Sequence, residues 1–302
     1  MSNNLIEFIQ KRKRELNAVI MAHFYQPPEI QDLADLVGDS LQLARDAANT
    51  QAGVIVFCGV SFMAESAKIL NPEKLVVMPE PEAGCPMADM ITADKLREWK
   101  ASRPEAKVVC YVNSSAEVKA ESDICCTSSN AVQVVNSIAP EYPILFVPDQ
   151  NLGNFVAGKT GRAIECWPGY CPIHHNVTAQ EIMEQKARHP QAPVVVHPEC
   201  RPEVIKLANE ALSTGGILKY AEKSPAQEFI IGTEAGLLHQ LKKRFPEKVF
   251  HIAREDFLCP NMKLTTLENL ARVMDTLEHK MEVPEEIRKR AYLALERMLN
   301  IS

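Results

Sequence analysis

Three cysteines that are each followed by proline recur along the chain at an almost constant spacing. The pairs are Cys85-Pro86, Cys171-Pro172 and Cys259-Pro260, so successive cysteines stand 86 and 88 residues apart. With 9 cysteines and 20 prolines in 302 residues, chance predicts roughly 0.6 such pairs. The near-constant period predicts an internal repeat in which each copy contributes one thiol.

Three thiolates so distant in sequence can bind one metal centre only if the fold brings them together. The chain has no C-x-x-C pair, so they do not form a local zinc motif. Three cysteines without a fourth in the same register fit a 4Fe–4S cluster in which one iron has no cysteine ligand and is open to a substrate. An open iron can act as a Lewis acid on a substrate oxygen. A zinc site completed by His174 is the alternative.

Polar residues keep a common register with these cysteines in all three segments. One residue ends a predicted strand 60 or 62 residues before each cysteine, a second follows two residues later, and a third stands 17 residues after the first. In chain order the sets are His23, Tyr25 and Ser40; Tyr111, Asn113 and Ser128; and His197, Glu199 and Thr214. The third residue of each set is expected to begin a helix, where free N–H groups and the helix dipole favour anions. Helix capping is the ordinary structural role of Ser and Thr there.

The elements that must position these residues follow the pattern of an α/β protein. Apolar runs of five to eight residues alternate with amphipathic stretches of ten or more, which is typical of parallel strands buried on both faces. We predict three strands in each segment, at 18–25, 53–59 and 74–80; 107–113, 142–149 and 162–169; and 192–199, 228–234 and 248–253. A helix is expected near 29–37. Ligands of such sheets bind beyond the carboxyl ends of the strands.

We therefore predict three homologous α/β/α domains with small parallel sheets in a pseudo-threefold arrangement, and an active site at their central interface. The expected boundaries are 1–91, which includes an N-terminal helix, 92–175 and 176–263. Residues 264–302 read as amphipathic helices that pack on the body.

Composition excludes several classes of protein. The content of 46% hydrophobic and 24% charged residues is that of a globular protein. A formal net charge of -6 without a basic run argues against nucleic-acid binding. The longest apolar run is too short to span a bilayer, and the start of the chain lacks the features of a signal peptide. We expect a cytoplasmic protein with reduced thiols.

The chain resembles the quinolinate synthase family. The matching stretches, spread from His23 to Lys263, are AHFYQPPEIQDLAD, GDSLQLA, FCGVSFMAE, GCPMA, YVNSSAEVKAESD, CTSSNA, FVPDQNLG, WPGYCPIH, HPEC, GTEAGLL and CPNMK. The resemblance implies a three-domain fold and one 4Fe–4S cluster held by Cys85, Cys171 and Cys259. It implies condensation of iminoaspartate with dihydroxyacetone phosphate to quinolinate, with loss of phosphate and water, in de novo NAD synthesis. An aspartate-oxidising enzyme would supply the iminoaspartate.

The resemblance also suggests roles for the polar residues. Condensation and dehydration need protons to be removed from carbon and delivered to leaving hydroxyls. Glu199 and Tyr25 are the acid/base candidates, and the expected catalytic set is completed by Tyr111, His23 and His197. The expected substrate-binding set is His23, Ser40, Tyr111, Asn113, Ser128, His174, His197, Glu199 and Thr214. Roles for Cys125, Cys126, Glu234 and Lys263 stay open.

Two other functions remain possible from the residues alone. One is another cluster-dependent hydro-lyase that acts on a different diacid, and the other is a zinc-stabilised binding protein without catalysis. The iron, sulfide and zinc content distinguishes the zinc-stabilised binding protein from the two cluster-dependent enzymes.

Overall fold

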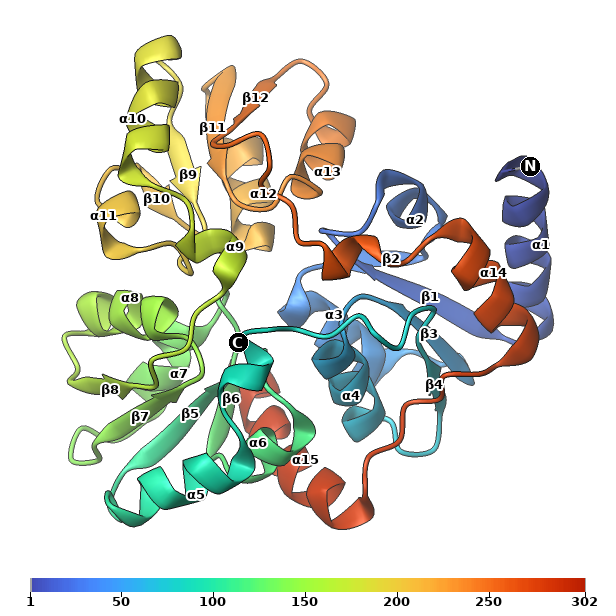
Figure 1. Ribbon diagram of the computed structural model, residues 1–302, viewed down its shortest axis with the longest axis horizontal. Helices are drawn as coiled ribbons and strands as arrows, with labels where there is room; N and C mark the ends of the chain where they lie inside the picture. Colours follow the sequence, from blue (N-terminus) through green and yellow to red (C-terminus); the bar gives the residue numbers. More distant parts are fainter. Residues whose placement is uncertain (1, 302) are drawn as a thin grey trace.

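The computed structural model describes residues 2–301 and contains three four-stranded parallel sheets with the same strand order. The orders are β2-β1-β3-β4, β6-β5-β7-β8 and β10-β9-β11-β12. Figure 1 shows three α/β units around a common centre, the first in blue, the second in green and the third in yellow and orange. The α/β fold with three small parallel sheets is therefore confirmed. Residues 1 and 302, the outer limits of the predicted domains, lie outside the described residues.

The first unit carries the N-terminal helix. Its strands are β1 (Ala18–His23), β2 (Leu36–Gly38), β3 (Val54–Cys58) and β4 (Leu75–Val77). Its helices are α1 (Ser2–Glu15), α2 (Pro28–Leu33), α3 (Ser40–Asn49) and α4 (Ser61–Leu70), followed by the 3-10 turn η1 (Ala88–Met90).

The second and third units repeat this order. The second contains α5 (Ala93–Ala101), β5 (Lys107–Tyr111), α6 (Ala116–Ala120), β6 (Ile124–Cys126), α7 (Ala131–Ser137), β7 (Ile144–Val147), α8 (Gln150–Thr160), β8 (Ile164–Cys166) and the short helix α9 (Pro172–His175). The third contains α10 (Ala179–Arg188), β9 (Val194–Val196), α11 (Pro202–Ile205), β10 (Glu210–Ala211), α12 (Thr214–Lys223), β11 (Glu228–Gly232), α13 (Leu237–Arg244), β12 (Val249–Ile252) and η2 (Asn261–Lys263).

Each sheet has a fourth strand that the sequence pattern did not predict. These are β2, β6 and β10, edge strands of only two or three residues. Such short strands leave no run of alternating or continuous apolar residues to recognise. The predicted helix at 29–37 was wrong beyond residue 33, since α2 ends at Leu33 and 36–38 pair with β1.

The strands are buried because helices cover both faces of each sheet. Every residue of β3 is buried, and β7 and β9 are equally enclosed. Continuous apolar strands are the expected composition of parallel sheets covered on both faces. No helix among residues 2–301 is long and apolar enough to cross a membrane.

Two C-terminal helices return the chain to the first two units. Helix α14 (Leu267–Thr276) packs against α1 and the first sheet, as Figure 1 shows on the right. Its Leu270, Val273 and Met274 are fully buried in that apolar cluster. Helix α15 (Glu285–Leu299) packs against α4, α6 and β6, and so joins the first unit to the second.

Candidate active site

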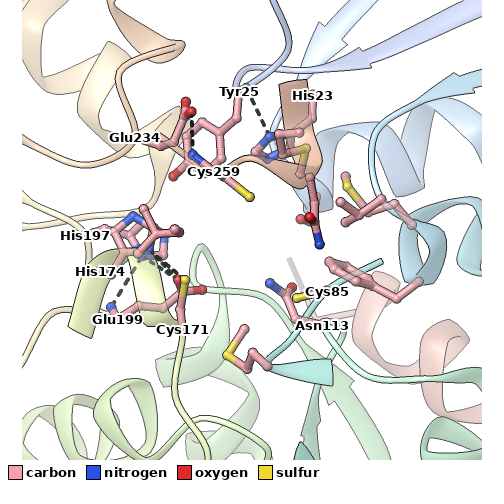
Figure 2. Close-up of a pocket in the computed structure, with 18 of the residues that line it drawn as sticks. His23, Tyr25, Cys85, Asn113, Cys171, His174, His197, Glu199, Glu234 and Cys259 are labelled. Carbon is pink, nitrogen blue, oxygen red and sulfur yellow. Dashed lines mark hydrogen bonds and ion pairs between the residues drawn. The ribbon is translucent and has the colours of Figure 1, made fainter. Parts of the chain in front are cut away.

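The carboxyl ends of strands from all three sheets open into one central cavity of about 210 Å³. All thirteen residues singled out from the sequence line it: His23, Tyr25, Ser40, Cys85, Tyr111, Asn113, Ser128, Cys171, His174, His197, Glu199, Thr214 and Cys259. Figure 2 shows side chains from the three units pointing toward the same space. Residues up to 236 positions apart in the chain are thus brought together.

The three Cys-Pro loops reach this cavity from the ends of β4, β8 and β12. Figure 2 shows the sulfur atoms of Cys85, Cys171 and Cys259 around the same space. Burial raises the pKa of Cys85 to about 12 and also raises the pKa values of Cys171 and Cys259. Such thiols ionise readily only when a metal centre takes the thiolate. Their convergence fits a cluster held by three cysteines.

The proline of the second loop, Pro172, begins a short helix. Cys171 is the N-cap residue of α9 and Pro172 is the first residue of that helix. Proline is well suited there, because its fixed φ is helical and the missing N–H would have no partner in the helix. The first and third loops are also linked, since Asn261 Nδ2 donates to the carbonyl oxygen of Gly84 at 2.7 Å.

Glu199 is a carboxylate of the cavity that is held by side chains from the second unit. Tyr111 OH donates to its Oε1 at 2.5 Å, and His174 Nδ1 lies 2.7 Å from its Oε2. Burial opposes ionisation, but His197, His174 and the hydrogen bond from Tyr111 outweigh it and lower the pKa of Glu199. The side chain is therefore a buried anion at neutral pH.

Two histidines occupy equivalent positions in the first and third units and make the same local contact. The Tyr25 backbone N–H donates to His23 Nδ1 at 3.2 Å, and the Glu199 backbone N–H donates to His197 Nδ1 at 3.3 Å. Burial lowers the pKa of His23 to about 4 and that of His197 to about 3. Both rings are neutral at pH 7, and with Nδ1 accepting, the proton stands on Nε2.

A threonine that the sequence pattern did not single out connects two of the predicted residues. Thr233 follows β11 and is fully buried. Its Oγ1 lies 2.6 Å from Tyr25 OH and 2.9 Å from His174 Nε2. A hydrogen-bonded chain therefore runs from Glu199 through His174 and Thr233 to Tyr25. Its sequence signals are its position at a strand end, which many residues share, and its place in the GTEAGLL stretch.

The polar residues at helix starts differ in detail from expectation. Ser40 and Thr214 are the first residues of α3 and α12, while the caps are the preceding residues, Asp39 and Ser213. Ser128 does not begin a helix, because Asn130 Oδ1 accepts from the Thr127 N–H and a turn precedes α7. Ser128 still lines the cavity, with Oγ 3.2 Å from His197 Nε2.

Asp39, also missed from the sequence, joins the three units in the wall of the cavity. Its Oδ1 accepts from the Gln42 N–H and so caps α3, while its Oδ2 accepts from Ser129 Oγ at 2.9 Å. Ser129 Oγ in turn lies 2.8 Å from Ser213 Oγ. One residue of each unit thus meets at this junction.

Glu234 and Lys263 connect the third cysteine loop to Tyr25. Glu234, with a fully buried side chain, accepts from the Cys259 N–H at 3.0 Å and pairs with Lys263 Nζ at 2.8 Å. Lys263 Nζ also donates to the Tyr25 carbonyl oxygen. Burial raises the pKa of Glu234 despite the neighbouring lysine. The pair therefore ties a loop of the third unit to a strand end of the first.

Replacement of this lysine should destabilise the protein. Lys263→Met leaves the buried Glu234 carboxylate without its cation, which we expect to lower the free energy of unfolding by about 2–3 kcal/mol. Urea unfolding of the metal-free protein measures the change. The double variant Glu234→Gln, Lys263→Met should recover part of the loss, because no unpaired charge remains. A single variant as stable as the parent chain would contradict the assignment of a stabilising pair.

Comparison with known proteins agrees with this geometry. The family model described as "Quinolinate synthetase A protein" matches residues 7–300. The chain is 55% identical over 293 residues to "Quinolinate synthase" of Dehalococcoides mccartyi, with 97% of each chain covered. It is 53% identical to "Quinolinate synthase 2" of Methanosarcina acetivorans, covering all of this chain and 97% of that one. "Quinolinate synthase" of Desulforudis audaxviator is 52% identical, with 99% of each covered. The chain therefore belongs to the quinolinate synthetase A family of enzymes.

Proposed function

We propose that the chain is a quinolinate synthase of NAD biosynthesis, which condenses iminoaspartate with dihydroxyacetone phosphate and releases phosphate and water. The observation that carries the proposal is the meeting of three thiols, one from each unit, with Glu199 and Tyr25 in one cavity. The names of its relatives support the same activity. An aspartate-oxidising enzyme would supply the iminoaspartate, and the expected compartment is the cytoplasm.

Cys85, Cys171 and Cys259 would hold a 4Fe–4S cluster with one iron free of protein ligands. Such an iron acts as a Lewis acid on a substrate hydroxyl or carbonyl oxygen. His174 Nδ1 lies 2.7 Å from Glu199 Oε2 and 3.4 Å from Cys171 Sγ, and its Nε2 lies 2.9 Å from Thr233 Oγ1. In the proposed cluster site His174 would orient Glu199 beside the thiolates rather than serve as the fourth ligand.

Glu199 and Tyr25 would carry the proton transfers. Glu199 is an anion held by Tyr111 and His174, so it can accept a proton in the cavity. Burial raises the pKa of Tyr25, with a further contribution from Glu199, so this hydroxyl keeps its proton at neutral pH and would release it only to a strongly basic oxygen, such as a departing alkoxide. The chain through Thr233 connects the two groups.

Neutral N–H and hydroxyl donors would bind the anionic parts of both substrates. Ser40 and Thr214, the first residues of α3 and α12, line the cavity at helix starts, where the helix dipole favours anions. His23 would offer its Nε2 proton, and His197 Nε2 donates to Ser128 Oγ, which leaves the Ser128 hydroxyl proton for a ligand. Such donors suit carboxylate and phosphate oxygens. Asn113 Oδ1 is buried and has no hydrogen-bond partner among residues 2–301, so this oxygen would accept a hydrogen bond from a substrate hydroxyl or N–H group.

Removal of the connecting hydroxyl should slow catalysis. Thr233→Val keeps a similar shape but breaks the chain between His174 and Tyr25, and we expect kcat to fall roughly 10–100-fold, less than the loss of a whole acid/base group. In a Tyr25→Phe background the same change should have little further effect. Thr265→Val, at a buried threonine outside the cavity, is the matched control. An unchanged kcat in Thr233→Val would refute the connection.

The proposal as a whole is tested with protein purified under strict anaerobiosis. We expect about four irons and four sulfides per chain with absorption that bleaches in air, and formation of quinolinate from iminoaspartate and dihydroxyacetone phosphate. Zinc in place of iron would refute the cluster. Cluster-loaded protein that forms no quinolinate would instead favour a hydro-lyase acting on a different diacid.

A further inference from the structure

A second group of possible metal ligands lies in the third unit, outside the central cavity. His189 follows α10, Glu228 is the first residue of β11, and His251 lies in β12. None of the three lines the cavity. Glu228 stands at the amino end of its strand, whereas the candidate active site lies beyond the carboxyl ends. The group is therefore separate from the site described above.

Both imidazoles point a nitrogen at the same carboxylate oxygen. His251 Nε2 lies 3.2 Å and His189 Nδ1 lies 3.6 Å from Glu228 Oε2, and the three atoms all lie within 4.8 Å of one another. In a tetrahedral zinc site with bonds of 2.0–2.1 Å, neighbouring ligand atoms stand roughly 3.3 Å apart. The separations of 3.2 Å and 3.6 Å between the histidine nitrogens and Glu228 Oε2 lie close to that value without any movement of the backbone.

The side chains are open enough for an ion to enter and close enough to one another to bind it. The side chains of His189 and His251 are 27% and 22% exposed, and that of Glu228 is 49% exposed. The two rings are stacked with centroids 3.4 Å apart and planes 17° from parallel. Neutral imidazole is the form of histidine that binds metal ions.

We propose that His189, Glu228 and His251 bind a divalent transition-metal ion, with Zn²⁺ the best match. Two imidazoles and one carboxylate suit borderline ions such as Zn²⁺ rather than Mg²⁺ or Ca²⁺, which take oxygen ligands. The stacked rings must rotate for their in-plane lone pairs to meet at the ion, and water would take the remaining position. The ion joins the end of α10 to β12, the edge strand of the third sheet.

The test measures zinc binding by the cluster-loaded protein under anaerobic conditions, in competition with a chromophoric chelator. We expect the parent chain to bind one Zn²⁺ more per chain than each of His189→Asn, Glu228→Gln and His251→Asn. His239→Asn is the matched control, because His239 is a similarly exposed histidine of the same unit that pairs with Asp32 alone. This variant should bind as much zinc as the parent chain.

The comparison between variants separates this site from the central one. Any zinc bound near Cys171 contributes equally to the parent and to all four variants, so failure of the proposed function would not change the difference. Equal melting temperatures without zinc establish that the variants are folded. In crystals soaked in ZnCl₂, anomalous scattering should place the ion between the three side chains. Unchanged zinc stoichiometry in any of the three ligand variants, or an ion located elsewhere, overturns the proposal.

Discussion

Cys171→Ala should abolish cluster binding and quinolinate formation while the chain stays folded. A 4Fe–4S cluster on three thiolates loses a third of its protein ligands with this change, and no other sulfur reaches the cavity from the second unit among the described residues. The change removes a single sulfur atom at the edge of the main apolar cluster, so the fold should be retained. We expect iron and sulfide contents near zero and loss of the visible absorption.

The matched control for this variant is Cys166→Ala. Cys166 belongs to the same unit and is also half-buried, but it lies at the end of β8 and does not line the cavity. It should keep the cluster and the activity. A coloured, active Cys171→Ala protein would show that the ligand set is wrong. If both variants lost iron, general damage to the second unit would be the cause instead.

Glu199→Gln should keep the cluster and lose turnover. The amide has nearly the shape of the carboxylate and can still accept from Tyr111, but it cannot accept a proton from carbon. The loss of a positioned acid/base group predicts a fall in kcat of about 10²–10⁴-fold. Anaerobic assays of quinolinate, normalised to iron content, measure it. Because the cysteine ligands are untouched, iron and sulfide should match those of the parent chain.

Glu203→Gln provides the comparison at a nearby glutamate. Glu203 lies in the first turn of α11, is half exposed and pairs with Arg201 at the surface. Turnover should be unaffected there, since surface ion pairs contribute little. If Glu199→Gln retained turnover, the base would have to be sought elsewhere in the cavity, and Tyr25 would be the next residue to replace.

The register of the three repeats predicts most of the fold and of the site. Strand-end residues such as His23 and His197 share an offset from a cysteine, and parallel α/β units place strand ends at one edge. Equivalent positions in three copies therefore had to meet if the copies packed around one axis. Most of the residues that were predicted to line the cavity follow from this register.

The residues that were missed make contacts between units. Thr233 bonds to Tyr25 and His174, and Asp39 bonds to Ser129. Such contacts depend on how the units are oriented, which no local pattern records.

The predicted helix start at Ser128 was too early, since α7 begins at Ala131. The side chain of Asn130, rather than that of Ser128, organises the turn before this helix, because it accepts from the Thr127 N–H. Single hydrogen bonds of this kind are invisible to apolar periodicity.

The return of α14 to the first sheet has a consequence for synthesis of the chain on the ribosome. The last strand of that sheet ends at Val77, yet the helix that completes its apolar cluster begins about 190 residues later, at Leu267. At translation rates of 5–20 residues per second, roughly 10–40 s separate the two. During that time, part of the apolar face around Ile20 and Val56 lies open to solvent or to chaperones. The first unit to emerge is thus among the last to be finished.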